Sequence, residues 1–432
     1  MLKRIKSYEH YDKSIQWGKK LSITGSAQII IQAVGFASGI LIIRLLSTQE
    51  YALYTLANTM LGTMIMLANG GISTGIMSLG AKVWEDKKKL GIVLETGLEL
   101  RRKFAIGSLL VATPLLAYLL LHNGASWLTT FLIVAALIPA FLAALSDSLL
   151  EVVPKLHQDI HPLQKNQIIV AMGRLLLNVL LVFLFPLTFI ALLANGIPRI
   201  YGNIHLKKIA YNNADAKQKT DEKVKKEILF FVKRMLPETI FFCVSGQITI
   251  WILSIFGSTS SLASIGAIGK LSMVFNLFTV IFGMLIIPNF AKLKEDSRLL
   301  LKKVFYVIIG CIILSVFAIS FTDFFSRELL SVLGKDYKDL NFELVLSIIG
   351  GCITFFQGCI FGLNNSRGWI INPLIYISVM IVVIIVGVQL IDVSTLSGVL
   401  YLNIVVGSSQ ALMLLYYNLF RIFKIKNKSY SL

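Results

Sequence analysis

Charged side chains are scarce in this chain. Only 15% of its 432 residues are Asp, Glu, Lys or Arg, whereas 56% are hydrophobic and the mean hydropathy is +0.76. Soluble domains carry roughly 25% charged residues, because such side chains keep their surfaces in water. The composition therefore excludes a soluble globular protein and indicates a protein that crosses a membrane several times.

Cysteine is also sparse, and the motifs of common cofactor sites are missing. The four cysteines lie in apolar stretches without CxxC spacing, which argues against disulfides or zinc and favours small packing residues: Cys243, Cys311, Cys352 and Cys359. His157 and His161 share a helix face, but a zinc site takes three or four protein ligands and no third lies nearby. No GxxxxGK[ST] loop is present, which excludes an ATPase site of that kind. We expect no metal and no cofactor.

Long apolar stretches are what the sequence has instead. About 12 of them suit a helix that crosses the hydrocarbon, which takes about 20 residues. They cover residues 22–46, 51–67 (with an apolar extension to 79), 104–121, 128–149, 167–185, 187–206, 228–256, 262–288, 304–324, 342–361, 371–391 and 396–419. The sequence predicts an all-α integral membrane protein with about 12 transmembrane helices.

Lys and Arg residues occupy every second gap between these stretches. The gaps at residues 82–103, 155–165, 207–226 and 292–303 are basic, as are the short gap at Arg367 and both chain ends, whereas the intervening gaps hold no Lys or Arg. The one exception is the gap with Arg327, Lys335 and Lys338, where acidic residues are interspersed. By the positive-inside rule, both termini are predicted to be cytoplasmic. The net charge of +18 then reflects membrane orientation and anionic headgroups, and we expect no nucleic-acid partner.

A polar segment, residues 207–227, divides the chain near its middle. Its run NNADAKQKTDEKVKKE lacks apolar periodicity and predicts a solvated cytoplasmic linker. The six spans on each side predict an N-terminal lobe of residues 1–206 and a C-terminal lobe of residues 228–432 around a central cavity. The hairpins LLSTQEYALYTLANTM and FGSTSSLASIGAIGKLSM resemble each other, which suggests duplication, although small residues are common in membrane helices anyway.

Several segments carry a family resemblance. The stretch RLLSTQEYALY, residues 44–54, resembles the first hairpin of the polysaccharide-exporter branch of the multidrug and oligosaccharidyl-lipid flippase superfamily. Residues 265–271, 287–293 and 329–337 resemble that family's eighth helix, its end and the segment after its ninth helix, and Pro237 fits as well. One departure is Asn69-Gly70-Gly71, where the family more often has an acidic residue before glycine. The conformation of that turn is therefore left open.

The resemblance implies an O-antigen-type flippase in the bacterial inner membrane. Such proteins move an undecaprenyl-pyrophosphate-linked oligosaccharide from the cytoplasmic to the outer leaflet by alternating access. The implied partners are this lipid-linked oligosaccharide, membrane lipids, and polysaccharide polymerase and chain-length proteins. The resemblance does not identify the sugar.

Two cations fall deep within predicted spans. Arg174 lies about nine residues, or ~14 Å, beyond Lys165, and Lys270 lies about eight residues, or ~12 Å, into its span. Buried ionisable side chains usually face a partner or a water-filled cavity. A guanidinium also offers a planar fork for phosphate, so Arg174 and Lys270 are candidates for binding the pyrophosphate from the two lobes. A structural ion pair, or snorkelling of the lysine, is the alternative.

Other charged residues lie nearer the span ends: Arg44, Arg199, Lys233, Arg234, Asp147 and Glu238. Arg199 could guide an anionic headgroup, and Lys233 with Arg234 could load it. Snorkelling and positive-inside anchoring explain all four cations as well, and we favour these explanations. Asp147 and Glu238 could carry a coupling cation or proton, but pairing with neighbouring cations is the explanation we favour.

Uncharged polar residues add a second set of candidates: Gln28, Gln32, Asn178 and Gln247. Gln28 and Gln32 share a helix face, as do Arg174 and Asn178. Such amides could bind sugar hydroxyls in a wet cavity, or they could join helices at about 1 kcal/mol each.

Two other functions remain open. A cation-coupled drug exporter of the same superfamily would need lumenal acids, whereas the deepest charges here are positive. A polysaccharide polymerase or glycosyltransferase would place its chemistry in a large outer loop, and the largest outer gap, residues 324–342, is short. We therefore expect a transporter and not an enzyme.

Overall fold

The computed structural model describes residues 25–291, 293–369 and 371–429, and every regular element within these ranges is a helix. The predicted all-α fold is confirmed. The chain forms two compact units. Unit 1 comprises residues 1–45 and 57–243, and unit 2 comprises residues 46–56 and 244–432. Helices α2 and α9 therefore each contribute to both units.

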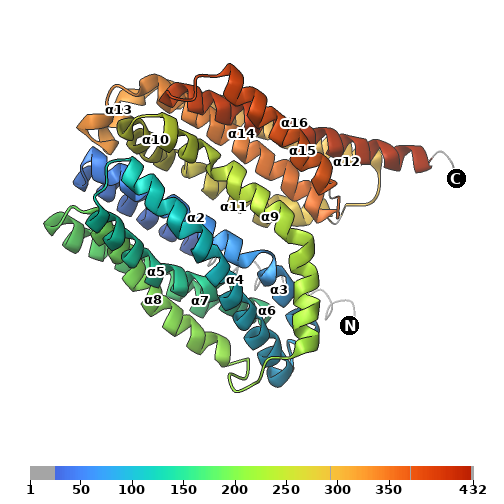
Figure 1. Ribbon diagram of the computed structural model, residues 1–432. Helices are drawn as coiled ribbons and strands as arrows, with labels where there is room; N and C mark the ends of the chain where they lie inside the picture. Colours follow the sequence, from blue (N-terminus) through green and yellow to red (C-terminus); the bar gives the residue numbers. More distant parts are fainter. Residues whose placement is uncertain (1–24, 292, 370, 430–432) are drawn as a thin grey trace, which may run out of the picture. The chain divides into compact units, whose positions relative to one another are not determined.

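Unit 1 is a helical bundle. It contains the helix Gly25–Leu45, most of α2 (Thr48–Asn69), α3 (Ile72–Val83), α4 (Lys87–His122), α5 (Trp127–Leu150), α6 (Val152–Leu156), α7 (Ile160–Leu177), its π-helical continuation η1 (Asn178–Val182), α8 (Thr188–Tyr211) and the first part of α9 (Glu222–Phe256). Helix α8 packs along α5 and α7 (Figure 1). The apolar core joins α3, α4, α5 and α9, with Ile72, Leu90, Leu149 and Ile228 completely buried.

Unit 2 is a second helical bundle. It contains the remainder of α9, α10 (Thr259–Leu271), α11 (Val274–Ala291), α12 (Ser297–Phe324), α13 (Ser326–Leu333), the 3₁₀ turn η2 (Lys335–Tyr337), α14 (Asn341–Ser366), α15 (Pro373–Leu390) and α16 (Leu396–Ser429). Helix α16 packs along α14 (Figure 1). The start of α2 belongs to this unit, where the Thr48 hydroxyl donates to the Asp336 carboxylate at 3.1 Å.

The helices of the described residues account for a multi-pass membrane protein. Ten are long and apolar enough to span a membrane, or 11 if α10 and α11, bent by 44°, form one span. Helix α12 has a mean hydropathy of 2.7 although only 11% of its apolar window is buried, which is expected of a helix that faces lipid. Each of the predicted spans coincides with one of these helices or with α8. Helix α8 is less apolar because it carries Asn195, Arg199 and Asn203.

The predicted solvated linker is shorter than expected. Helix α8 runs to Tyr211 and α9 begins at Glu222, so both ends of the predicted segment 207–227 are helical. The reason is local: the Asp221 carboxylate accepts from the backbone of Lys223 (2.7 Å) and Val224 (3.0 Å), which caps α9 in the manner of an N-terminal Asp. The boundary between the compact units also differs from the predicted lobe boundaries, because it falls at Cys243 within α9.

Two hairpins begin their second helix in the same way. The Ser47 hydroxyl accepts from the Glu50 backbone (3.3 Å) before α2, and the Ser258 hydroxyl accepts from the Ser261 backbone (3.0 Å) before α10. These are the two segments whose sequences resemble each other. A serine cap satisfies a helix-terminal N–H group, so the serine that the two segments share has the same structural role in both.

The turn left open by the sequence is a break between α2 and α3. Gly70 and Gly71 adopt φ angles of +46° and +96°, in the region that favours glycine. No loop separates the two helices, because α3 starts at Ile72, the residue after Gly71. The break brings Asn69 and Ser73 together, with the Ser73 hydroxyl donating to the Asn69 amide oxygen at 2.8 Å.

Candidate functional site

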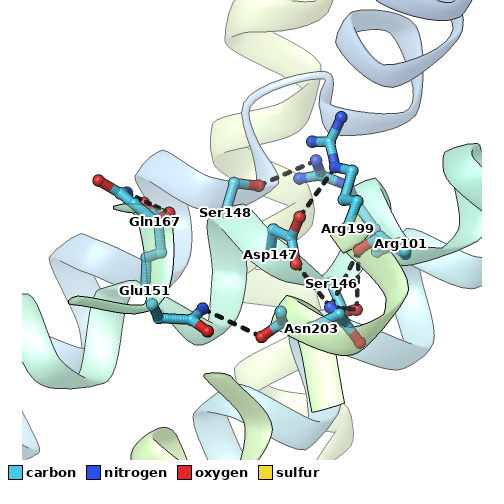
Figure 2. A network of polar contacts seen from close by, with 11 residues as sticks. Arg101, Ser146, Asp147, Ser148, Glu151, Gln167, Arg199 and Asn203 are labelled. Atoms are coloured by element: carbon cyan, nitrogen blue, oxygen red, sulfur yellow. Dashed lines mark hydrogen bonds and ion pairs between the residues drawn. The ribbon is translucent and has the colours of Figure 1, made fainter. Parts of the chain in front are cut away.

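A buried arginine lies at the centre of a polar network in unit 1. Arg101 of α4 is 2% exposed. Its Nη1 donates to Asn69 Oδ1 and to Ser73 Oγ (3.2 Å), and its Nη2 donates to Ser148 Oγ (3.0 Å) on α5. Figure 2 shows this guanidinium bonded to Ser148 beside the other charged residues of α5 and α8. All three acceptors are neutral.

Arg101 is not among the residues predicted from the sequence, because it lies in a basic gap. Its neighbours Arg102 and Lys103 are exposed, whereas Arg101 points inward. The signal that could have found it is helical phase: Leu94, Arg101 and Ser108 repeat every seven residues, and all three are buried. Because α4 continues unbroken from Lys87 to His122, that phase carries from the apolar span into the basic gap.

Arg199 of α8 forms an ion pair with Asp147 of α5. Its Nε lies 3.0 Å from Asp147 Oδ2, and the two side chains are 27% and 20% exposed. The Asn203 amide donates to the second carboxylate oxygen at 2.7 Å (Figure 2). Of the alternatives left open for these residues, the pairing of Asp147 with Arg199 is observed. The carboxylate is thus engaged on both oxygens.

A separate chain of glutamines connects the first helix to α7 and to Glu151 at the end of α5. The Gln28 amide lies 3.4 Å from the side-chain oxygens of both Gln164 and Gln167. Gln167 donates to Glu151 at 3.1 Å (Figure 2), and Glu151 pairs with Lys155 at 2.6 Å. Of the predicted site residues in unit 1, the structure therefore pairs Asp147 with Arg199 and places Gln28 in the glutamine chain.

Arg174 and Asn178 lie one turn apart, as expected, where α7 passes into its π-helical continuation. Arg174 is half-buried, and Asn178 is completely buried. The Asn178 amide donates to Ser38 Oγ at 2.7 Å and to Asn195 Oδ1 at 3.3 Å. Asn178 therefore joins three helices of unit 1, which is the helix-joining alternative for such amides.

The remaining predicted site residues lie elsewhere in the chain. In unit 2, Lys270 is half-buried in the last turn of α10, and Gln247 is half-buried in α9. In unit 1, Gln32 is half-buried, and the cations Arg44, Lys233 and Arg234 are exposed, as snorkelling or anchoring side chains would be. The side chain of Glu238 lies outside the described residues. None of these positions tests a role in binding.

His157, one of the two histidines that share a helix face, contacts neighbouring residues. The His157 ring lies 5.4 Å from the Trp84 ring, with its Nδ1 3.0 Å from the Val153 carbonyl, and His161 is exposed. In the part of the chain that the structure describes, no group of three or more His, Cys, Asp or Glu side chains could hold a metal. All four cysteines are buried as free thiols, which agrees with their predicted packing role.

The charge balance of the unit 1 network favours anions. Arg101 and Arg199 supply two positive charges against the one carboxylate of Asp147, while Glu151 is balanced by Lys155. A guanidinium can donate a pair of parallel hydrogen bonds to a phosphate, so this network could hold an anionic oxygen cluster.

Comparison with solved structures identifies the fold. An inward-facing multidrug resistance MATE family transporter of the MOP superfamily superposes with a TM-score of 0.73, covering 92% of this chain and 96% of that chain at 15% identity. The chain has the MATE transporter fold. No family model matches the sequence, and no curated protein matches it either.

Other MATE-fold structures agree. An outward-facing conformation of a MATE transporter gives a TM-score of 0.63 over 94% of the chain and 96% of its own length, at 15% identity. A MOP superfamily transporter from Pyrococcus furiosus gives 0.65 at 17% identity, covering 94% of this chain and 95% of its own. Its description states that reverse polarity of its binding pocket suggests a different function. At these identities the comparisons establish the two-lobed membrane fold and no substrate.

Proposed function

We propose that the protein is a membrane transporter that moves a polyprenyl-pyrophosphate-linked oligosaccharide across the bacterial inner membrane. The observation that carries this proposal is the sign of the charges inside the helices. The cations Arg101, Arg174 and Lys270 are buried or half-buried along α4, α7 and α10. Two acids of the unit 1 helices are already paired: Asp147 of α5 is engaged by Arg199 and Asn203, and Glu99 of α4 pairs with Lys103.

Cationic side chains suit an anionic cargo for an electrostatic reason. A pyrophosphate that leaves water loses its hydration, and nearby positive charges offset part of that cost because attraction grows as the dielectric constant falls. The polyprenyl tail can remain in the bilayer while the polar head crosses. For one fold relative, reverse polarity of the binding pocket is described as suggesting a different function, which supports a cargo other than that of the multidrug transporters.

The decisive experiment is complementation of a cell that lacks its own O-unit flippase. Wild type is expected to restore surface polysaccharide, and Arg174→Ala and Lys270→Ala are each expected to reduce it at least about tenfold, because each removes a cation that donates hydrogen bonds to phosphate oxygens. Lys294→Ala, which removes an exposed cation between α11 and α12, is the matched control and should restore fully.

The results test the cationic mechanism separately from the flippase function. Full restoration by both Arg174→Ala and Lys270→Ala would remove the cationic mechanism while keeping the flippase. Failure of the well-expressed wild type to restore polysaccharide would contradict the flippase for that oligosaccharide.

A drug exporter is the second candidate, because the structural neighbours include multidrug resistance transporters. Such a protein would lower the accumulation of cationic dyes in the same cells, and Asp147→Asn would be expected to abolish that efflux. Efflux without polysaccharide restoration would favour the exporter.

A further inference from the structure

We propose that Arg101 and Arg199 together form a binding site for a phosphate-type anion within unit 1. Arg101 is charged and 2% exposed, yet each of its hydrogen-bond acceptors, Asn69, Ser73 and Ser148, is neutral. Its Nε is buried and makes no hydrogen bond. Among the ion pairs of the described residues, none includes Arg101. A buried charge without a counter-charge is costly, so an anion that reaches it gains the missing interaction.

The second guanidinium provides the approach to this site. Arg199 is held through its Nε by Asp147, the residue directly before the Ser148 that binds Arg101. Figure 2 shows both guanidinium groups bonded to this one stretch of α5. The Arg199 side chain is 27% exposed, whereas that of Arg101 is enclosed. An anion could therefore meet Arg199 first and then reach Arg101 past Ser148.

The chemistry of the donors suits phosphate oxygens. Guanidinium forks bind phosphates through parallel hydrogen bonds, and the hydroxyls of Ser73 and Ser148 can rotate to donate instead of accept. Pyrophosphate offers two linked oxygen clusters for two guanidiniums. The choice of pyrophosphate over other oxyanions rests on the proposed function. The source of the group can be a free anion or a lipid headgroup.

A purely structural role for Arg101 is the competing explanation, since its partners hold the break between α2 and α3. The two explanations diverge for Asn69→Asp. That substitution places a carboxylate on the oxygen that already accepts from Arg101. Pairing would raise the stability of the ligand-free protein in either case. It would weaken anion binding only if Arg101 binds the anion.

The test uses the purified full-length chain in nanodiscs of zwitterionic lipid, titrated calorimetrically with inorganic pyrophosphate. We expect saturable binding by wild type, weakened at least about tenfold by Asn69→Asp and by Arg101→Lys, which keeps the charge but loses the planar fork. Arg102→Lys changes the exposed neighbour in the same way and should bind like wild type. Asn213→Asp, outside the network, controls for the added negative charge. Melting temperatures without ligand report folding separately.

Each outcome decides between the explanations. Wild-type affinity in both Asn69→Asp and Arg101→Lys would overturn the proposal and leave Arg101 a structural residue. If these two variants do not fold, Arg199→Lys decides in their place, since its side chain is partly exposed: reduced affinity supports the site and unchanged affinity overturns it.

A second arm distinguishes the source of the anion. Nanodiscs that contain phosphatidic acid present a phosphate monoester on a lipid, and competition between this lipid and pyrophosphate is expected if one site serves both. Binding of neither ligand by wild type overturns the site. Binding that persists in a chain that fails to restore polysaccharide supports the site while contradicting the flippase. Restored polysaccharide without any such binding contradicts the site alone.

Discussion

At Arg101 a full positive charge lies among the oxygens of Asn69, Ser73 and Ser148. Hydrogen bonds to charged groups contribute more than those between neutral groups, and leaving a buried charged donor unsatisfied costs more than the ~1–3 kcal/mol of a neutral group. These hydrogen bonds therefore hold the Arg101 side chain in place, whereas the adjacent Arg102 side chain is exposed. Two neighbouring residues of the same type differ in role because only one lies on the buried face of α4.

The position of Asn69 and Ser73 around Arg101 depends on Gly71. Gly71 has a φ of +96°, and a Cβ added there would lie 2.9 Å from the Met235 Cβ of α9. Gly71→Ala is expected to destabilise unit 1 by about 1–3 kcal/mol, because an L-residue is strained in this conformation and the contact is too short. Thermal unfolding of the purified protein measures the effect.

Gly107→Ala is the matched control for that substitution. Gly107 lies within α4, and a Cβ there would meet nothing within 4 Å. The change should be neutral or stabilise by up to about 1 kcal/mol, since alanine is the better helix former. A Gly71→Ala protein as stable as wild type would show that the break tolerates a side chain.

At the scale of elements, helix ends are fixed by short polar side chains. Asp86 accepts from the backbone N–H groups of Lys88 (3.0 Å) and Lys89 (3.1 Å) at the start of α4, and Asp296 does the same for Arg298 (2.9 Å) at α12. An acid at this position also interacts favourably with the helix dipole. These caps fix where the two helices begin.

The cap of α4 predicts a pH dependence. The backbone N–H of Lys89, above all, holds the pKa of Asp86 below its ordinary value of 3.8. A lowered folded-state pKa stabilises the fold at pH values above the ordinary pKa, and this stabilisation is lost as the pH falls through the folded-state pKa. Asp86→Asn keeps a capping oxygen but cannot ionise, so it should lose less stability than wild type below about pH 4. Melting temperatures between pH 3 and 7 measure the difference.

Glu85→Gln is the control for that experiment, because it removes a neighbouring carboxylate from the same segment without changing the cap. It should follow the wild-type profile. If Asp86→Asn and wild type lose stability in parallel as the pH falls, the ionised cap does not contribute in the expected way.

At the scale of the whole molecule, the basic gaps predict which side of the membrane each loop faces. The four cysteines are buried, so new cysteines at exposed positions can be labelled selectively. With Lys217→Cys, between α8 and α9, a membrane-impermeant maleimide should react only after permeabilisation of the cells. With Ser260→Cys, at the start of α10, it should react with intact cells, because the positive-inside rule places this gap outside. The reverse pattern would invert the topology.

Most of the fold could be predicted because membrane helices have a strong local signal. A stretch such as residues 304–324 must form a helix to satisfy its backbone in lipid, and α12 covers it. The bend between α10 and α11 could not be predicted, since residues 262–288 are continuously apolar. The helical residues at both ends of the segment 207–227 could not be predicted, because a polar composition does not show that Asp221 caps a helix.

The candidate site was only partly predictable. Asp147 and Arg199 stand out as charges in apolar stretches, and the ion pair that joins α5 to α8 is one of the alternatives their sequence positions allow. Arg101 does not stand out, because it belongs to a run of three basic residues, Arg101, Arg102 and Lys103. Asn69 could not be predicted as a hydrogen-bond acceptor for Arg101 either, since the two residues are 32 positions apart in the sequence.

The sequence by itself determined that the chain is a helical membrane protein, because hydrocarbon imposes both the length and the composition of each span. It also predicted that Arg174 and Lys270 lie furthest within the spans, and their role in binding stays a prediction. Only the tertiary structure decided which of the near-surface charges are paired, as Arg199 is, and which one is enclosed by neutral partners, as Arg101 is. The physical reason is that burial and pairing depend on side chains from other helices, and those neighbours exist only once α3, α4, α5 and α8 have packed.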